Sequence, residues 1–166
     1  MITLFRLLAR VPMPLMHWFG AMLGWLVWWS APGYRRRFKA NAASAGFGPG
    51  QYRPAISAAG KMASELPWLW LRPHGETVLD RVVRWEGVEA FEAAMQAKKG
   101  VILVAPHLGS WEMCGQAIGE RFLASYGPIT ALFRPARKKW MADLIAAGSR
   151  DRPGRPCPPT TPACAA

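Results

Sequence analysis

A histidine followed at a fixed spacing by an acidic residue is the feature of this sequence most able to do chemistry. His107 and Glu112 stand five positions apart in the segment VILVAPHLGSWE, residues 101–112. An imidazole can take a proton from a hydroxyl group, and a nearby carboxylate can hold one ring nitrogen and stabilise the imidazolium that forms. Because no Ser, Cys or Thr stands in an obvious nucleophile elbow, we expect that hydroxyl to belong to a substrate. The pair predicts general-base catalysis; the alternative is a capped turn whose histidine only bonds backbone.

The predicted base lies where a strand gives way to a helix. Residues 101–105 form an unbroken apolar run, typical of a strand buried on both faces, and Pro106 ends its hydrogen-bond ladder. His107 then stands at the carboxyl end of the strand, where open α/β sheets build their binding crevices. Ser110 is suited to cap the following helix, and Glu112 falls in its first turn, where the helix dipole favours a negative charge. With 10 acidic residues in 166 the spacing alone is weak evidence, so this setting carries most of the prediction.

Strands and helices alternate around this segment. The hydrophobic periodicity predicts strands over residues 81–87, 101–105 and 127–135. It predicts helices over residues 88–100, 111–122 and 136–148. Such alternation is typical of an α/β layer with a mostly parallel sheet, and that is the fold class we expect.

A long charge-free segment precedes this region. Residues 11–34 contain no Asp, Glu, Lys or Arg, are rich in Trp, and are about as long as a bilayer-spanning helix requires. Cations flank the segment on both sides: Arg6, Arg10, Arg35, Arg36, Arg37 and Lys39. The heavier cluster follows it, and the positive-inside rule then places the rest of the chain on the cytoplasmic side. We expect a membrane-associated helix that spans the bilayer or lies in its interface; the alternative is a buried hairpin of two short core helices.

The remaining segments complete the predicted organisation. Glycines and prolines over 45–54 predict a loop, and residues 55–70 predict a helix with Pro67 as a kink or terminator. The α/β pattern stops after three strands, fewer than an ordinary sheet has, which indicates a shortened or altered C-terminus. The sequence predicts three parts: a hydrophobic membrane anchor with a basic flank over 1–40, a partial α/β domain over 41–152, and a disordered Pro-rich tail over 153–166.

Composition narrows the class of partner. A formal net charge of +11 favours anionic partners such as acidic lipid, an acidic carrier protein or nucleic acid. The motifs of nucleic-acid-binding proteins are missing, so we expect no nucleic acid. Hydrophobic residues make up 51% of the chain, which suits a protein resting on a membrane. The three cysteines lack metal-ligand spacing, and we expect neither a metal nor a cofactor.

Several of these segments together resemble a known family. HLGSWE resembles the His-x4-Asp/Glu motif of glycerolipid-type acyltransferases. Its context KKGVILVAPHLGSWEMCG, the later segment ALFRPARKKWMADLI, and the Trp-rich segment followed by YRRRFKANAA are similar to the late (secondary) lipid A biosynthesis acyltransferases, of the lauroyl/myristoyl type. The likeness covers residues 1 to about 152, and four segments occur in the family's order. The tail after Arg152 resembles nothing in the family, which implies a truncated chain with an altered end.

The resemblance implies an enzyme at the cytoplasmic face of the inner membrane. It would move a fatty acyl group from acyl carrier protein to a hydroxyl of a lipid A precursor, in lipopolysaccharide biosynthesis, without a covalent acyl-enzyme. His107 would be the general base and Glu112 its orienting partner. Arg134 matches a family arginine that contacts the substrate's anionic head, and a guanidinium suits a sugar phosphate.

Three alternatives stay open. Arg137, Lys138 and Lys139 either add to the field at the head group or form a solvated helix start. The acceptor could be another glycolipid. The chain could also be an inactive truncated remnant that binds membranes without acyl transfer.

Overall fold

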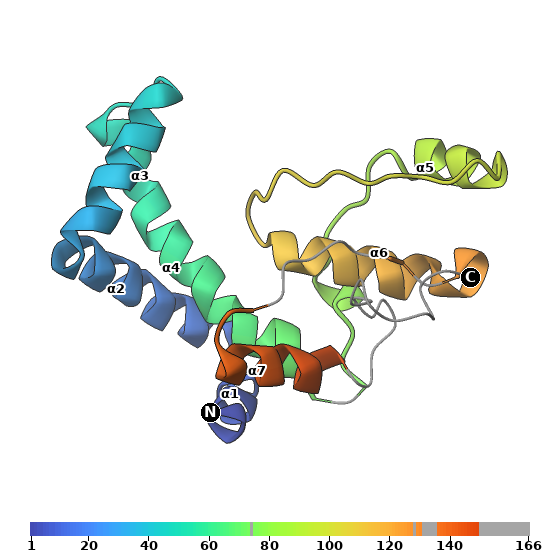
Figure 1. The fold of residues 1–166 in the computed structure, drawn as a ribbon, viewed down its shortest axis with the longest axis horizontal. Helices are drawn as coiled ribbons and strands as arrows, with labels where there is room; N and C mark the ends of the chain where they lie inside the picture. Colours follow the sequence, from blue (N-terminus) through green and yellow to red (C-terminus); the bar gives the residue numbers. More distant parts are fainter. Residues whose placement is uncertain (74, 128, 131–135, 150–166) are drawn as a thin grey trace. The chain divides into compact units, whose positions relative to one another are not determined.

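Helices make up all the regular structure in the described part of the chain (Figure 1). The computed structural model describes residues 1–73, 75–127, 129–130 and 136–149. Its elements are α1 (Ile2–Leu8), α2 (Met13–Ser30), α3 (Pro32–Ser44), α4 (Pro49–Leu71), the 3-10 turn η1 (Leu79–Arg81), α5 (Val88–Gln96), α6 (Trp111–Tyr126) and α7 (Lys139–Ser149).

The expected α/β fold with a mostly parallel sheet is wrong for these residues. The predicted strands at 81–87 and 101–105 contain no strand, and Ile102 and Val104 are 91% and 89% exposed instead of buried in a sheet. A strand forms only where a neighbouring strand takes its hydrogen bonds, and no described residue supplies that ladder. The third predicted strand, 127–135, falls mostly on residues outside the described part. The unbroken apolar run at 101–105 is typical of a buried strand, but a strand also needs a neighbouring strand that accepts and donates its backbone hydrogen bonds.

The chain divides into two compact units. The N-terminal unit is Thr3–Trp68, and the C-terminal unit is Leu69–Ala166 together with Met1–Ile2. The boundary falls inside α4, so the last residues of that helix belong with α5, α6 and α7.

In the N-terminal unit, α2 and α4 approach each other at glycines. A Cβ atom added to Gly20 would lie 2.7 Å from the carbonyl oxygen of Gly60, and one added to Gly60 would lie 2.7 Å from the backbone nitrogen of Gly24. Both distances are shorter than a real Cβ contact with backbone. Only residues without a side chain allow two helix backbones to come this close. The glycines therefore fix which side of α2 faces α4.

Substituting Gly60 by Ala is expected to destabilise the N-terminal unit by about 1–3 kcal/mol, because the added methyl group overpacks a helix contact that cannot open locally. Chemical denaturation followed by circular dichroism measures the loss. The matched control is Gly115→Ala in α6, where an added Cβ would meet nothing within 4 Å. The control should keep or slightly raise stability, since Ala favours a helix over Gly. Equal behaviour of the two variants would contradict the close contact.

An aromatic cluster joins three helices of the same unit. The ring of Trp28 from α2 lies 5.5 Å from that of Phe38 in α3 and 6.0 Å from that of Tyr52 in α4. Phe38 and Tyr52 are 5.8 Å apart, and Trp28 itself is only 7% exposed. The pairs Trp28–Phe38 and Phe38–Tyr52 are edge-to-face, an arrangement that adds stability beyond the buried area. The cluster anchors the carboxyl end of α2 to both neighbouring helices.

The charge-free segment 11–34 forms one continuous helix and the start of the next. α2 runs over 18 residues, so the alternative of a hairpin of two short helices is wrong. Pro32 begins α3 at a position where proline is tolerated, because its missing N–H has no partner in a first turn. None of the helices in the described ranges combines the length and apolar character expected of a membrane span.

α4 is longer than the sequence predicts. The expected loop over 45–54 gives way to helix from Pro49, and Pro67 lies inside the helix instead of ending it. Each internal proline removes only one backbone hydrogen bond, and buried residues such as Ile56 and Leu69 hold the helix by packing. Tertiary contacts therefore keep α4 helical although its glycines and prolines favour a loop or a helix end.

In the C-terminal unit, α5 packs on α6 through aromatic rings. Phe91 lies 4.6 Å from Phe122 and 6.0 Å from Tyr126, and Trp85, ahead of α5, meets Phe122 at 6.1 Å. From the end of α5 the chain returns as an extended segment to the beginning of α6 (Figure 1). That segment carries His107.

Candidate active site

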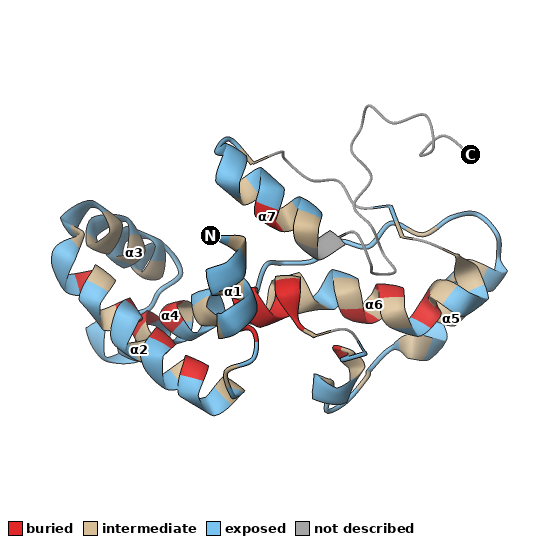
Figure 2. Cartoon of the chain, turned by 90° about the horizontal axis from the view of Figure 1, so that it is seen from below, coloured by how far each residue is buried: buried red, intermediate tan, exposed pale blue. Residues whose placement is uncertain are grey.

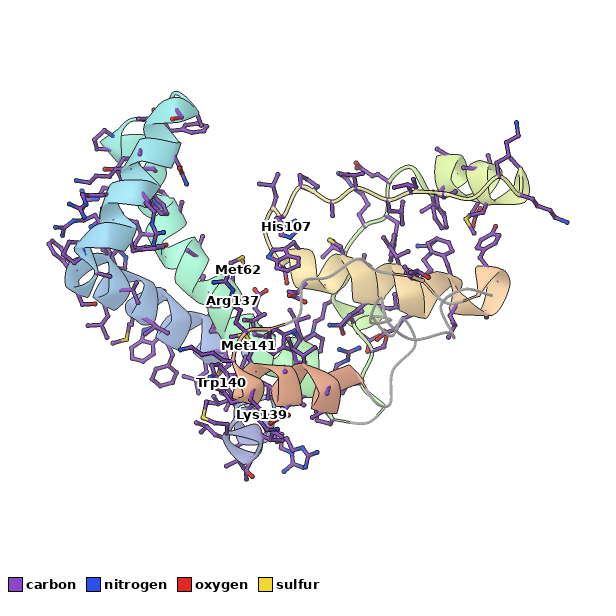
Figure 3. All side chains as sticks on the ribbon, in the orientation of Figure 1. Met62, His107, Arg137, Lys139, Trp140 and Met141 are labelled. Carbon is purple, nitrogen blue, oxygen red and sulfur yellow. The ribbon has the colours of Figure 1, made fainter. Side chains whose placement is uncertain are left out.

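His107 lies on the exposed loop that leads into α6 (Figure 3). Its backbone has a φ of 40°, in the left-handed region that few residues other than glycine adopt. The imidazole stacks on the ring of Trp111, with centroids 4.1 Å apart and planes 23° from parallel. Its Nδ1 lies 3.2 Å from the carbonyl oxygen of Ala105. The ring is therefore held by a stacking partner on one face and by a backbone acceptor at one nitrogen.

These contacts suit an imidazole that accepts a proton. When Nδ1 carries the hydrogen it donates to Ala105, and Nε2 then keeps its lone pair. A base must also be reached by the group it deprotonates, and His107 is exposed. The geometry is compatible with a general base and equally describes a histidine that bonds backbone.

Glu112 lies in the first turn of α6 and has a different partner from the one expected. Its Oε2 accepts a hydrogen bond from the indole nitrogen of Trp70, at 3.4 Å. Among the described residues no hydrogen bond or ion pair joins His107 to Glu112. Ser110 occupies the N-cap position of α6, as predicted, but its hydroxyl makes no capping hydrogen bond. The structure brings the two predicted catalytic residues to the same end of α6 without pairing them.

The predicted cationic contacts are only partly described. Arg134 lies outside the described residues. Arg137, Lys138 and Lys139 are exposed at the start of α7, where Figure 3 labels two of them. Lys139 bonds Asp143, one turn later, at 3.3 Å. This placement fits both alternatives, a charged field near the substrate and a solvated helix start.

A buried charged cluster that the sequence does not predict lies around Arg72. Arg72, just after α4, is only 4% exposed, and its guanidinium donates to the carbonyl oxygen of Leu69 at 3.0 Å and to Gln116 Oε1 at 2.6 Å. It also forms an ion pair with Glu120, and its Nε donates to the carbonyl oxygen of Glu76 at 3.0 Å. Burial lowers the pKa of Arg72 from its ordinary value, while the charge of Glu120 acts in the opposite direction.

Glu120 is the centre of this cluster. Besides Arg72, it accepts hydrogen bonds from the Thr77 hydroxyl at 2.5 Å and from the Val78 backbone nitrogen at 3.0 Å, both to its Oε2. Val78 is fully buried. A largely buried carboxylate with this many donors holds its neighbours in one arrangement. Through Glu120, α6 is fixed to residues 72–78.

The cluster and the predicted site share one face of α6. Glu112, Gln116 and Glu120 are spaced by four residues and therefore lie one above the other along the helix. All three bond groups from residues 69–72: Trp70, Leu69 and Arg72. This polar stripe was the signal in the sequence that could have located the cluster. It sets the position of the first turn of α6, next to His107.

Among the described residues no group of His, Cys, Asp and Glu side chains could hold a metal ion. The arrangement can support proton transfer by His107, whose ring stacks on Trp111 in the first turn of α6. A proton acceptor of this kind suits an acyl transfer in which a hydroxyl group attacks a carbonyl carbon.

Comparison with known proteins supplies the family. No curated protein and no solved structure matches the chain. A model of the bacterial lipid A biosynthesis acyltransferases matches residues 1–155, which includes the N-terminal unit, most of the C-terminal unit and the loop with His107. The resemblance of the four sequence segments is thereby confirmed at the level of the family. The chain belongs to the bacterial lipid A biosynthesis acyltransferase family.

Proposed function

We propose that this acyltransferase moves a fatty acyl group from acyl carrier protein to a hydroxyl group of a lipid A precursor, with His107 as the general base. The observation that carries the proposal is the placement of His107. Its exposed ring is stacked on Trp111 and bonded through Nδ1, in a chain that belongs to a family of acyltransferases. The strongly basic chain favours an acidic carrier protein and a phosphorylated acceptor.

The reaction needs a base to remove the proton from the acceptor hydroxyl group. His107 Nε2 takes the proton from the acceptor hydroxyl, and the oxygen forms an ester bond with the acyl carbon of the thioester. The carbon–sulfur bond then breaks, and the imidazolium returns its proton to the departing thiolate of the carrier. No side chain of the protein is acylated.

Glu112 is proposed to stabilise the imidazolium. Its present hydrogen bond from Trp70 is 3.4 Å long, beyond the usual range for N–H···O, and is therefore weak. We expect the carboxylate to exchange Trp70 for the Nδ1–H of His107 when the ring becomes charged, in place of the carbonyl oxygen of Ala105, because a charged donor makes the stronger hydrogen bond with a carboxylate. Arg134 is proposed to bind the anionic head of the acceptor. The site of action is proposed to be the cytoplasmic face of the inner membrane, on the basis of the cations that follow α2.

Incubating the purified full chain with acyl carrier protein thioester and a lipid A precursor is expected to add one ester-linked acyl chain to the lipid. Mass spectrometry of the extracted lipid measures the product. Parallel reactions replace the donor by acyl-coenzyme A, or the acceptor by another phosphorylated glycolipid. Acylation of the other glycolipid alone would reject the acceptor, and absence of transfer to every acceptor would reject the catalytic proposal.

A further inference from the structure

The loop that carries His107 is exposed along most of its length. Every residue from 102 to 109 is exposed, in pale blue in Figure 2. Exposed side chains ordinarily exchange between rotamers within nanoseconds. A general base is effective only when its nitrogen lies within hydrogen-bond reach of the proton that it removes. An imidazole on such a loop therefore needs contacts of its own to keep one orientation.

The stack of His107 on Trp111 differs in geometry from the aromatic packing elsewhere in the same unit. The rings of Phe91, Phe122 and Tyr126 meet at 42° to 87°, as tilted or edge-to-face pairs between α5 and α6. The planes of His107 and Trp111 are only 23° from parallel, and their centroids are 4.1 Å apart. A near-parallel stack covers one face of the imidazole and leaves the edge of the ring open. The Nε2 atom therefore stays accessible while the ring is held.

The backbone of the loop is bent where the stack forms. His107 and Gly109 have φ values of 40° and 58°, both in the left-handed region. This conformation is unfavourable for a histidine and persists only where other contacts offset its cost. The stack on Trp111 and the hydrogen bond to the carbonyl oxygen of Ala105 are such contacts. Trp111 is the first residue of α6, so the helix gives the indole a fixed place.

We propose that Trp111 is a positioning residue for the base, and this inference rests on the proposed function. Its indole holds the His107 imidazole with Nδ1 at the carbonyl oxygen of Ala105 and with Nε2 open to the acceptor hydroxyl. A cation over the face of an indole is attracted to it, so the same stack favours the imidazolium that forms when Nε2 takes the proton. Trp111 thus acts through His107 and touches no reacting atom.

The stack is tested first without any reaction, by NMR of the full chain with isotopically labelled histidine. The ring protons of His107, identified as the signals absent from His107→Ala, should lie upfield because of the ring current of the indole. Trp111→Leu should move them downfield, toward the positions of an unstacked histidine. The matched control is Trp85→Leu, which removes an indole that packs on Phe122, about three turns further along α6. The control should leave the signals in place, and unmoved signals in Trp111→Leu would overturn the proposal.

The positioning role is tested by the kinetics of acyl transfer from the carrier thioester. Trp111→Leu should lower kcat by about tenfold and change KM by less than about twofold, because the indole contacts the base and not the substrate. Trp111→Phe keeps an aromatic face under the imidazole and should recover most of the lost kcat. Trp85→Leu should keep the kcat of the unaltered chain. A loss of stability in Trp111→Leu with kcat unchanged would show a packing role alone and would reject the inference.

A double variant shows whether Trp111 acts through His107. In the His107→Ala background, Trp111→Leu should change single-turnover acyl transfer by less than about twofold, because the side chain that it positions is absent. A loss of about tenfold in both backgrounds would mean that Trp111 acts apart from His107, against the proposal. Transfer that depends on His107 but not on Trp111 would overturn this inference alone. Absence of transfer by the unaltered chain would overturn the proposed function and, with it, the role of Trp111.

Discussion

Replacing Arg72 by methionine is expected to destabilise the C-terminal unit by roughly 3–5 kcal/mol, because removing one partner of a buried ion pair leaves the other charge uncompensated. The orphaned group is Glu120, which among the described residues would keep the Thr77 hydroxyl and the Val78 backbone nitrogen as donors. Gln116 and the carbonyl oxygen of Leu69 would each lose a charged donor as well. Hydrogen exchange of the α6 backbone amides measures the loss within this unit.

Two further variants make this result specific. Arg84→Met removes a cation from an ion pair whose side chains are 78% and 72% exposed, and it should leave exchange in α6 unchanged. The double variant Arg72→Met/Glu120→Leu should recover part of the lost stability, since a buried pair can be replaced by apolar groups of similar size. Recovery should be incomplete because Thr77 and Val78 lose their acceptor. A small effect of Arg72→Met, equal to that of Arg84→Met, would contradict the structural role of the cluster.

Replacing His107 by alanine is expected to reduce acyl transfer by about 10²- to 10⁴-fold, the usual contribution of a positioned general base. Stability should change little, because the side chain is exposed and its partners are a backbone carbonyl and the Trp111 ring. The measurement is kcat/KM for transfer from the carrier thioester to the lipid A precursor.

The control for this variant is Cys114→Ser, an exposed position on α6 two residues beyond Glu112. It should retain full activity and shows whether α6 tolerates substitution near the site. If His107→Ala retained kcat/KM within about threefold of the unaltered chain, His107 would supply none of the barrier reduction that a general base provides.

Local signals located most of the helices. Those predicted over 88–100, 111–122 and 136–148 are confirmed as α5, α6 and α7, with ends that differ by a few residues. The signals that predict a helix are the amphipathic spacing of its residues and the turn residues at its ends. Both are local, so a single sequence suffices to predict these helices. The apolar run at 101–105 carried an equally clear local signal, yet it forms no strand in the described residues. A strand depends on a distant partner, and a run of apolar residues does not reveal one.

At the candidate site, too, features that depend on neighbouring residues are predictable from the sequence, and contacts between distant residues are not. The sequence predicts His107 between a strand and a helix; the structure has the helix α6 after it but no strand before it. Arg72 was missed because its partners Gln116 and Glu120 are 44 and 48 positions away. The side-chain hydrogen bond from the Trp70 indole to Glu112 spans 42 positions and is not predictable from neighbouring residues for the same reason.

Chemical rescue gives the sharpest single measurement on the proposed base. Imidazole added to the His107→Ala variant should raise single-turnover acyl transfer in proportion to its concentration, because the exposed site left by the side chain admits a small base. The unaltered chain should not respond. Imidazole that leaves the variant inactive, or that accelerates both chains equally, would contradict the claim that His107 takes the proton from the acceptor hydroxyl.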